Sequence, residues 1–467
     1  MQIGSIATWA WQDFGSAEIE DRRWTRRLVR MAGQAARRPA GRITETFSDD
    51  AERQGAYGLL ETEAVSSQQI SSAMFAACAK RAADEAFVYV PVDGSSLTLA
   101  DRQEAKDFGP IGSRREGARG LKVMTAMVLT SQAVPLGVSA QRWWARAPRR
   151  RKKHRDQLPA QAKETGNWLD VMEQTKEVLA AHAPQTRCWF QLDREGDSWP
   201  ILTTAARGDH WFTVRSCRKR RVHLPHGGRT FLAPLLAQQP VMTTYQLPVI
   251  GGRHRTARLA TLALRACTVT LDLRDKRTGK RFPMAINVVQ VLEQGTTPPG
   301  ESPIQWTLLT NRPLETLAQM HEVIDGYATR WRIEELHKSW KSGACRVEET
   351  QLRSAEATIK WATILLAVAV RIERIKHLSR EQPDRPATDE FTPLEIRAAA
   401  LLHFGAAART RLAPNVAPTI ADVTLWIAKI GGYTGRTSSG GPPGTITLAR
   451  GLKDVRTAAK ALAAAAQ

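Results

Sequence analysis

The fifteen residues from Tyr327 to Lys341 (YATRWRIEELHKSWK) place one acid among several bases. Read as a helix at about 100° per residue, they put five polar or ionisable side chains on one narrow stripe: Tyr327, Arg330, Glu334, Lys338 and Lys341. A separate apolar stripe has the spacing of a helix packed on a core: Ile333, Leu336 and Trp340. A charged stripe is most often a solvated surface. One carboxylate flanked by a phenol, an arginine and two lysines could instead hold a metal ion beside a phosphate backbone.

Two aspartates end predicted strands elsewhere in the chain. The strands Phe87 to Asp93 (FVYVPVD) and Arg187 to Asp193 (RCWFQLD) each finish on an acid. Either aspartate alone is more often a cap or turn residue. With Glu334 they provide three carboxylates, the ligands that Mg²⁺ prefers, and Mn²⁺ could substitute. Two such ions can activate a nucleophile and stabilise a leaving 3′ oxygen. The trio therefore predicts metal-dependent phosphoryl transfer on nucleic acid.

The composition of the chain supports a polyanionic partner. The 467 residues include 67 Lys and Arg against 46 Asp and Glu, a formal net charge of +21 that is spread along the chain. Nucleic acid is the first interpretation and an anionic membrane surface the second. No run of apolar residues is long enough for a transmembrane helix, and the first residues do not resemble a signal peptide. The five cysteines are scattered, which indicates free thiols rather than a zinc site.

A helical DNA-binding domain is predicted for residues 1–70. The segment from Ile19 to Ala36 has apolar residues at helical spacing with arginines crowded around them, among them Arg26, Arg27 and Arg30. A second helix is expected from Asp49 to Leu60. A basic helix in a small bundle suits phosphate contact and docking in a DNA groove, although a merely soluble helix is the competing interpretation.

Residues 71–380 are predicted to form an α/β catalytic domain. After the first strand come two strands of a meander, Gly120 to Thr130 and Val134 to Trp144, followed by a basic loop, Ala145 to Arg155. A helix, the strand ending at Asp193, and another strand follow. Strand, meander, helix and strand in this order are typical of an RNase H-like core. Residues 217–300 are rich in β-forming residues and are interpreted as an inserted β-domain.

Helices are expected to complete the chain. Pro313 is expected to begin the helix that carries the charged stripe, and Gly326 predicts a kink just before Tyr327. Residues 381–467 are predicted to be a C-terminal helical domain, with helices at Pro393 to Leu412, at Ile420 to Ile430 and in the Ala-rich tail.

The spacing Tyr327-x2-Arg330-x3-Glu334-x6-Lys341 resembles the Y-R-E-K signature of bacterial insertion-sequence transposases of the cut-and-paste DDE class, in particular the branch that forms DNA hairpins. VDGSSL around Asp93 and LDREGD around Asp193 are similar to the settings of that family's first two acids. The similarity also covers EDRRWTRRLVRMA, QGAY, ETGNW, FTVRS, IQWTLLT and IAKIGGY, and so it spans nearly the whole chain.

The resemblance implies a role for each matching residue. Asp93, Asp193 and Glu334 would hold the divalent ions. Tyr327, Arg330 and Lys341 would grip phosphates at the transposon end, with Lys338 beside them. Arg215 would contact DNA near the centre. Trp306 would support a base flipped out in the hairpin, although on sequence alone a core tryptophan is the more frequent case.

The resemblance also implies partners and a location. We expect double-stranded DNA, both transposon ends and target, and a homodimer formed by the C-terminal helices on paired ends, in a bacterial cytoplasm near the nucleoid. Two alternatives stay open: a DNA-binding regulator without catalysis, and a general RNase H-like nuclease without end specificity.

Overall fold

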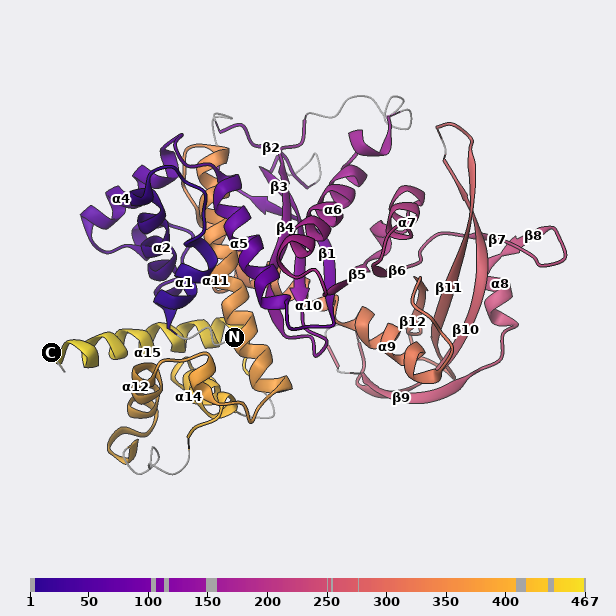
Figure 1. The fold of residues 1–467 in the computed structure, drawn as a ribbon. Helices are drawn as coiled ribbons and strands as arrows, with labels where there is room; N and C mark the ends of the chain where they lie inside the picture. Colours follow the sequence, from indigo (N-terminus) through magenta and orange to yellow (C-terminus); the bar gives the residue numbers. More distant parts are fainter. Residues whose placement is uncertain are drawn as a thin grey trace.

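The computed structural model describes residues 5–101, 106–112, 117–147, 158–249, 251–252, 255–275, 277–408, 417–435 and 441–465 (Figure 1). Most of the predicted basic loop Ala145 to Arg155 lies outside these residues. No helix in the described ranges combines the length and hydropathy needed to cross a membrane. All five cysteines are free thiols, as the sequence indicated.

Twelve strands, counted over the described residues, form one mixed sheet. Its main path runs β2-β3-β1-β5-β6-β12-β11-β10-β7-β8, with β4 paired to β3 and β9 to β10. The strands in the first half of the chain are β1 (Phe87–Thr98), β2 (Gly109–Pro110), β3 (Arg119–Leu129), β4 (Pro135–Trp144), β5 (Arg187–Leu192) and β6 (Trp211–Arg215). The others are β7 (Arg221–His223), β8 (Arg229–Phe231), β9 (Thr243–Val249), β10 (Arg258–Arg274), β11 (Arg281–Glu293) and β12 (Gln305–Thr310).

The strand order β4-β3-β1-β5-β6 forms the expected core. β3 pairs antiparallel with both β1 and β4, and a tight turn in which Ala133 adopts a positive φ of 60° joins β3 to β4. β5 and β6 then run parallel to β1. Pro91 lies within β1, and no antiparallel partner in β3 is recorded for Val90 or Pro91, because proline has no N–H to donate. A meander followed by parallel strands fits the RNase H-like core that the order of elements predicted.

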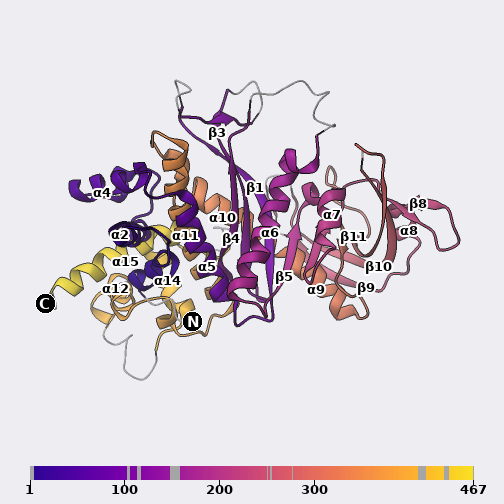
Figure 2. The same cartoon turned by 45° about the horizontal axis from the view of Figure 1, so that its top comes forward.

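Helices cover both faces of this sheet (Figures 1 and 2). On one face, α6 (Glu164–His182) and α7 (Trp199–Ala205) share a core with Val88, Val90 and Val92, and α8 (Leu232–Ala237) packs further along the sheet against β8 and β10. On the other, α9 (Leu317–Ala328), α10 (Trp331–Lys341) and α11 (Ala355–Glu381) pack with Tyr89 and Trp189. Alternate residues of β1 therefore belong to different cores, as the two-residue period of a strand requires.

The helices at the two ends of the chain pack beside α11, on the side away from β10 (Figure 1). The N-terminal helices are α1 (Ile6–Phe14), α2 (Arg22–Arg37), α3 (Ile43–Thr46), α4 (Asp50–Glu61) and α5 (Ser67–Ala82). The C-terminal helices are α12 (Pro393–Phe404), α14 (Ile420–Ile430) and α15 (Thr445–Ala465). Short 3-10 turns lie at Ala160–Ala162, Arg194–Gly196, Val347–Glu349, Ala387–Asp389 and Gly405–Ala407. α11 is almost entirely buried, because all of these helices and the sheet surround it.

The predicted inserted β-domain is not a separate sheet. β10 and β11 lie within residues 217–300, yet β11 pairs along its length with β12, which pairs with β6 of the core. The backbone hydrogen bonds between strands thus continue without a gap from β6 of the core through β12 to β11 of the insertion. A hydrophobic pattern shows that strands exist there, but it does not show which edge they pair with.

Two further expectations about helices were wrong. The helix preceding Tyr327 begins at Leu317 rather than Pro313, because Thr316 and Gln319 form a capping box at its first turn. The predicted helix from Pro393 to Leu412 ends at Phe404, where Gly405 adopts a positive φ of 57°.

Candidate active site

Asp93 and Asp193 are brought together by two neighbouring strands. β1 and β5 are parallel, with Val92 opposite Leu192, so the two aspartates follow directly on paired residues. Val92 and Leu192 both belong to the core under α6 and α7. The next side chain on each strand therefore projects to the opposite face, where α9 and α10 lie.

The prediction that β1 ends at Asp93 was wrong. β1 continues to Thr98, because Asp93 to Thr98 pair with Thr125 to Gly120 of β3. Only the neighbouring β5 stops, at Leu192. Asp193 does end its strand and caps a 3-10 turn, where its Oδ1 accepts a hydrogen bond of 2.7 Å from the Glu195 N–H.

Glu334 is delivered by α10, which begins just after a break in the predicted helix. α9 ends at Ala328 and α10 starts at Trp331, and the turn between them has three-residue hydrogen bonds such as Ile333 N–H to the Arg330 carbonyl. The kink thus follows Tyr327 instead of preceding it. Gly326 has a different role: a Cβ there would lie 2.7 Å from the Tyr89 ring, so this glycine lets α9 approach the sheet.

The apolar stripe of the sequence analysis is confirmed. Ile333, Leu336 and Trp340 are fully buried. Their burial fixes the rotation of α10, and Glu334 on another side of the helix is left partly exposed toward the two aspartates.

The three carboxylates form one electrostatic unit. Burial and, after it, the nearby charges of Asp193 and Glu334 together raise the pKa of Asp93 to about 7, against the lowering effect of Arg330. Asp93 therefore sits among like charges that favour its protonated form. Such a cluster is stabilised when a cation enters it.

Arg330 bridges two of these carboxylates. Its guanidinium lies 3.5 Å from Asp93 Oδ2 and donates a hydrogen bond of 2.5 Å to Glu334 Oε1. Burial opposes the charged form of Arg330, but the Glu334 hydrogen bond raises the pKa above its ordinary value. In this arrangement Arg330 neutralises acids, whereas the sequence interpretation had it gripping phosphate.

Three further side chains of the predicted site contact one another beside Arg330: Tyr327, Arg215 and Trp306. The Tyr327 hydroxyl is hydrogen-bonded with Arg330 and Arg215, and burial raises its pKa. The Trp306 ring meets the Tyr327 ring edge to face, with centroids 5.4 Å apart. Trp306 is half-buried, and so it is neither a fully buried core residue nor a free surface ring.

The two lysines of the stripe lie further along α10. Lys338 is exposed, and the Lys341 ammonium lies 3.8 Å from Glu348 Oε1. Glu348 also accepts a hydrogen bond of 2.7 Å from the Thr98 N–H, which places Lys341 over the end of β1.

The donor set fits a divalent cation. Asp93, Asp193 and Glu334 supply only carboxylate oxygens, and burial together with the charges of Asp193 and Glu334 raises the pKa of Asp93 although Arg330 lies beside it. Hard ions such as Mg²⁺ select this chemistry.

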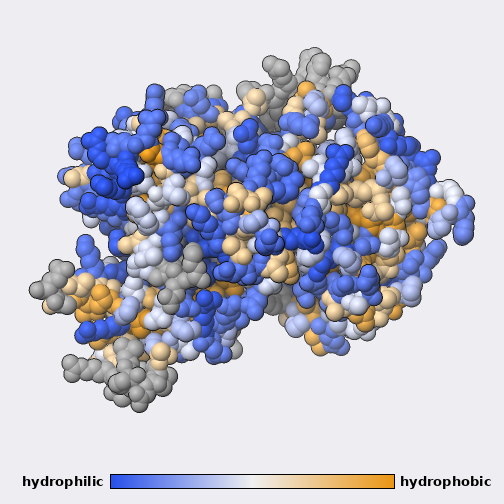
Figure 3. Space-filling model, in the orientation of Figure 1, coloured by the Kyte–Doolittle hydropathy of each residue, from blue (hydrophilic) through white to orange (hydrophobic). Residues whose placement is uncertain are grey.

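The predicted DNA-contacting arginines lie on α2. Arg26 is exposed, Arg27 is partly buried against α4 near Gly55, and Arg30 forms an ion pair of 2.9 Å with Glu52. The surface over α2 and α4 is strongly hydrophilic (Figure 3).

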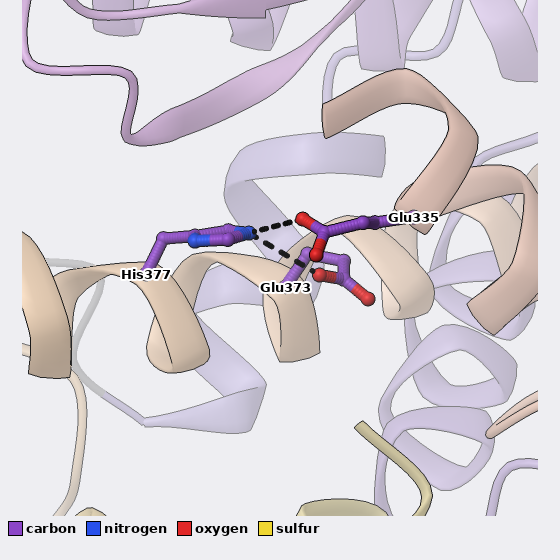
Figure 4. Close-up of side chains that lie close together, drawn as sticks. All are labelled: Glu335, Glu373 and His377. Atoms are coloured by element: carbon purple, nitrogen blue, oxygen red, sulfur yellow. Dashed lines mark hydrogen bonds and ion pairs between the residues drawn. The ribbon is translucent and has the colours of Figure 1, made fainter. Parts of the chain in front are cut away.

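A buried ion network that the sequence analysis missed lies behind α10. His377 Nε2 is 3.0 Å from Glu335 Oε2 and 3.5 Å from Glu373 Oε2 (Figure 4). These ligand-type atoms lie within 4.8 Å of one another, but the Lys376 ammonium already pairs with both acids. The cluster therefore joins α10 to α11 by ion pairs. The Glu-x3-His spacing of Glu373 and His377, directly after the apolar first part of the helix, was the available signal.

Two protein-family models match the chain, one over the N-terminal helices and one over most of the predicted catalytic domain. A transposase DNA-binding family matches residues 6–65, which comprise α1 to α4. A transposase DDE domain matches residues 191–370, which include Asp193 and Glu334. Asp93 lies before the second match, and its membership of the site rests on the paired strands and the shared electrostatics.

Proposed function

The chain is a transposase with an N-terminal DNA-binding domain and a DDE catalytic domain, and from this premise we propose that it moves its element by cut-and-paste transposition through a DNA hairpin. It binds the terminal inverted repeats, cleaves one strand at each end, and uses the freed 3′-OH to form the hairpin. Water then attacks the hairpin phosphorus, which reopens the hairpin and frees the 3′-OH again. The same 3′-OH then attacks target DNA.

The observation that carries this proposal is the meeting of three carboxylates, two from adjacent parallel strands and one from α10. Asp93, Asp193 and Glu334 would hold Mg²⁺, or Mn²⁺ in its place. The bound ions supply activation of the attacking oxygen and charge stabilisation at the leaving 3′ oxygen.

The bonds balance in each step. In end cleavage the oxygen of water bonds to phosphorus, the bond from phosphorus to the 3′ oxygen breaks, and the proton lost by water is balanced by one taken up by the leaving oxygen. Hairpin formation and strand transfer repeat this exchange with a 3′-OH as the attacking group.

The basic and aromatic neighbours position the DNA in this proposal. Arg330, which lies against Asp93 and Glu334, would grip a phosphate held beside these carboxylates, with Tyr327 and Arg215 holding its side. Lys338 and Lys341 grip the backbone further along α10, and Trp306 offers an aromatic surface to a displaced base. On α2, Arg26, Arg27 and Arg30 contact phosphates of the inverted repeat.

The domain limits stay part of this proposal: residues 1–70 for end binding, 71–380 for catalysis, with 217–300 inserted, and 381–467 for pairing of two copies. Its setting is the bacterial cytoplasm, beside the nucleoid.

The test replaces the acid on α10. Glu334→Gln keeps the side-chain shape and removes the charge, so it should abolish cleavage and strand transfer while a gel-shift assay still shows binding to a duplex with the inverted repeat found beside the gene. Glu177→Gln, on the exposed side of α6, is the matched control and should keep full activity. Cleavage by the Glu334 variant would refute the assignment. Repeat binding without nicking by the wild-type protein in Mg²⁺ would favour a silent regulator.

A further inference from the structure

A strongly basic groove lies beside α7, outside the catalytic centre. Its cavity of about 940 Å³ is bounded by the start of α6, by α7, by residues 218–221 and by the adjoining ends of β10 and β11. Nine of its lining residues are Lys or Arg and two are Asp. We call it the arginine groove and follow four of its residues: Arg207, Lys219, Arg274 and Arg277.

Two of the acids in and under the groove are paired with arginines, and the third, Asp275, is buried and accepts hydrogen bonds from the Arg277 N–H and the Thr278 hydroxyl. Asp197 is fully buried, pairs with Arg220, and accepts hydrogen bonds from the backbone N–H groups of Cys217 and Arg218. The Asp272 carboxylate is likewise buried, and it pairs with Arg229 at 3.0 Å and with Arg281. These contacts fix the walls of the groove and leave little negative charge for the remaining cations.

Four of the cations that line the groove are exposed at its surface. Arg207, Lys219, Arg274 and Arg277 are exposed, and no ion pair joins any of them to another residue in the described part of the chain. Beside them, Trp199 and Phe282 stack with centroids 5.2 Å apart, which gives the groove a rigid aromatic wall. Like charges gathered in a concave surface attract a polyanion, and the phosphates of DNA are the polyanion this enzyme works on.

The groove joins a second cavity that reaches residues beside the catalytic centre. This second cavity, of about 590 Å³, shares Arg218, Lys219 and Arg220 with the groove and extends to Arg194 and Arg215. Arg194 directly follows Asp193, and Arg215 is hydrogen-bonded with Tyr327. A basic path therefore runs from the carboxylates into the groove.

The groove and the proposed end-gripping residues lie on opposite sides of the carboxylates. Lys341 lies over the end of β1, next to β3, through its contact with Glu348. The groove lies beyond β6, toward β10. Since Asp93 and Asp193 stand on β1 and β5, between these positions, one duplex held near Lys341 leaves the groove open for another.

We propose that the arginine groove binds the phosphate backbone of the target duplex and guides it to the carboxylates for attack by the 3′-OH of the transposon end. This inference rests on the proposed function, since it assigns a surface to the second DNA substrate of the same centre.

The experiment compares Arg274→Ala/Arg277→Ala with Lys80→Ala/Arg255→Ala, a control that removes the same charge from exposed positions on α5 and in the turn between β9 and β10. Protein preloaded with pre-cut ends in Ca²⁺ is titrated with a fluorescent random-sequence duplex over a salt series. The log–log slope of target affinity should become shallower by about 1.8 in the groove variant, at about 0.9 for each lost phosphate contact, and stay unchanged in the control.

A second arm measures chemistry in Mg²⁺. The ratio of strand transfer to end cleavage should fall at least about fivefold in the groove variant only. An unchanged salt slope would overturn the proposal. So would an equal loss of cleavage and strand transfer, which would mean that the groove holds the transposon end. The titration with the random-sequence duplex needs no catalysis. If the wild-type protein were inactive, that would count against the proposed function, and the effect of the groove variant on target binding could still be measured.

Discussion

Asp93 lies between two other carboxylates and one guanidinium, and this setting decides when it ionises. Burial and the charges of Asp193 and Glu334 bring its pKa to about 7, while Arg330 works in the other direction. A carboxyl group whose pKa is raised in the folded protein stabilises the fold below its unfolded pKa of 3.8, and this stability is lost as the pH rises through about 7. Above that pH the ionised site is strained by repulsion and is ready for a cation.

This setting predicts a pH-dependent response to metal. Mg²⁺ should raise the midpoint of thermal unfolding more at about pH 8 than at about pH 6, because protonation of Asp93 competes with the ion only at the lower pH. Differential scanning fluorimetry with and without Mg²⁺ measures both increments. Asp93→Asn serves as the comparison: without metal it should be more stable than wild type at the higher pH, and its Mg²⁺ increment should be small at both. If Mg²⁺ raised the unfolding midpoint of the wild-type protein equally at the two pH values, the proposed competition between the proton and the cation at Asp93 would be contradicted.

At the scale of single elements, α10 is the part on which the site depends, and α11 holds it from behind. Glu373 on α11 pairs with Lys376 and accepts hydrogen bonds from Ser339 of α10 and from Thr445 of α15, the latter at 2.8 Å. Burial raises the pKa of Glu373, but the contacts with His377, Lys376 and Ser339 outweigh it and hold the pKa at about 2. One buried carboxylate therefore joins three helices.

Removing that charge should destabilise the protein. Glu373→Gln leaves Lys376 buried without its closest partner, and we expect a loss of about 3 kcal/mol in the free energy of unfolding. Guanidinium denaturation at neutral pH measures it. Glu381→Gln is the control in the same network, since its 2.9 Å pair with Arg332 is partly exposed and is worth about 0–1 kcal/mol.

Glu373→Gln should also change how the free energy of unfolding depends on pH in acid. The lowered pKa means that the contribution of Glu373 is complete above its unfolded value of 4.5 and is lost as the pH falls toward about 2. Wild type should lose stability over this interval more steeply than Glu373→Gln. Equal stability of the two proteins at neutral pH would show that the network does not brace α10.

At the scale of the whole molecule, different surfaces suit different partners: the arginine groove lies on the sheet, and a candidate interface with another copy lies on the C-terminal helices. One continuous sheet connects β1 and β5, which bear the aspartates, with β10, which borders the arginine groove. The C-terminal helices expose leucines on the opposite side of the molecule: Leu394, Leu401, Leu402 and Leu425. Exposed apolar side chains gathered on two helices suit association with another copy.

This surface predicts how paired-end complexes form. Leu402→Glu/Leu425→Glu should reduce complexes that contain two ends by about tenfold or more, because a desolvated charge opposes an apolar interface, while binding of a single end is kept. Native mass measurement of protein with end duplex gives both populations. Leu259→Glu on β10, which is even more exposed at 61%, is the control. Loss of single-end binding in the C-terminal variant, or intact pairing, would exclude these helices as the interface.

The sequence by itself predicted the chemistry that is proposed for this protein. Asp93, Asp193, Glu334 and the spacing of the charged stripe could be read without coordinates, because residue type fixes ligand preference. Local periodicity fixes which side of a strand or helix is buried, and so the buried stripe Ile333, Leu336 and Trp340 was predicted correctly. The approximate order of strands and helices followed from the same local signals.

The tertiary structure alone decided how these parts meet. β1 runs past Asp93 because β3 offers it a partner, the insertion extends the core sheet because β12 pairs with β11, and the helix breaks after Ala328 where α9 leaves the sheet. Arg330 reaches Asp93, and Glu373 reaches Ser339 and Thr445, across long stretches of chain. Pairing between distant segments depends on which surfaces are available after folding, and a local pattern in one segment carries no information about its partner.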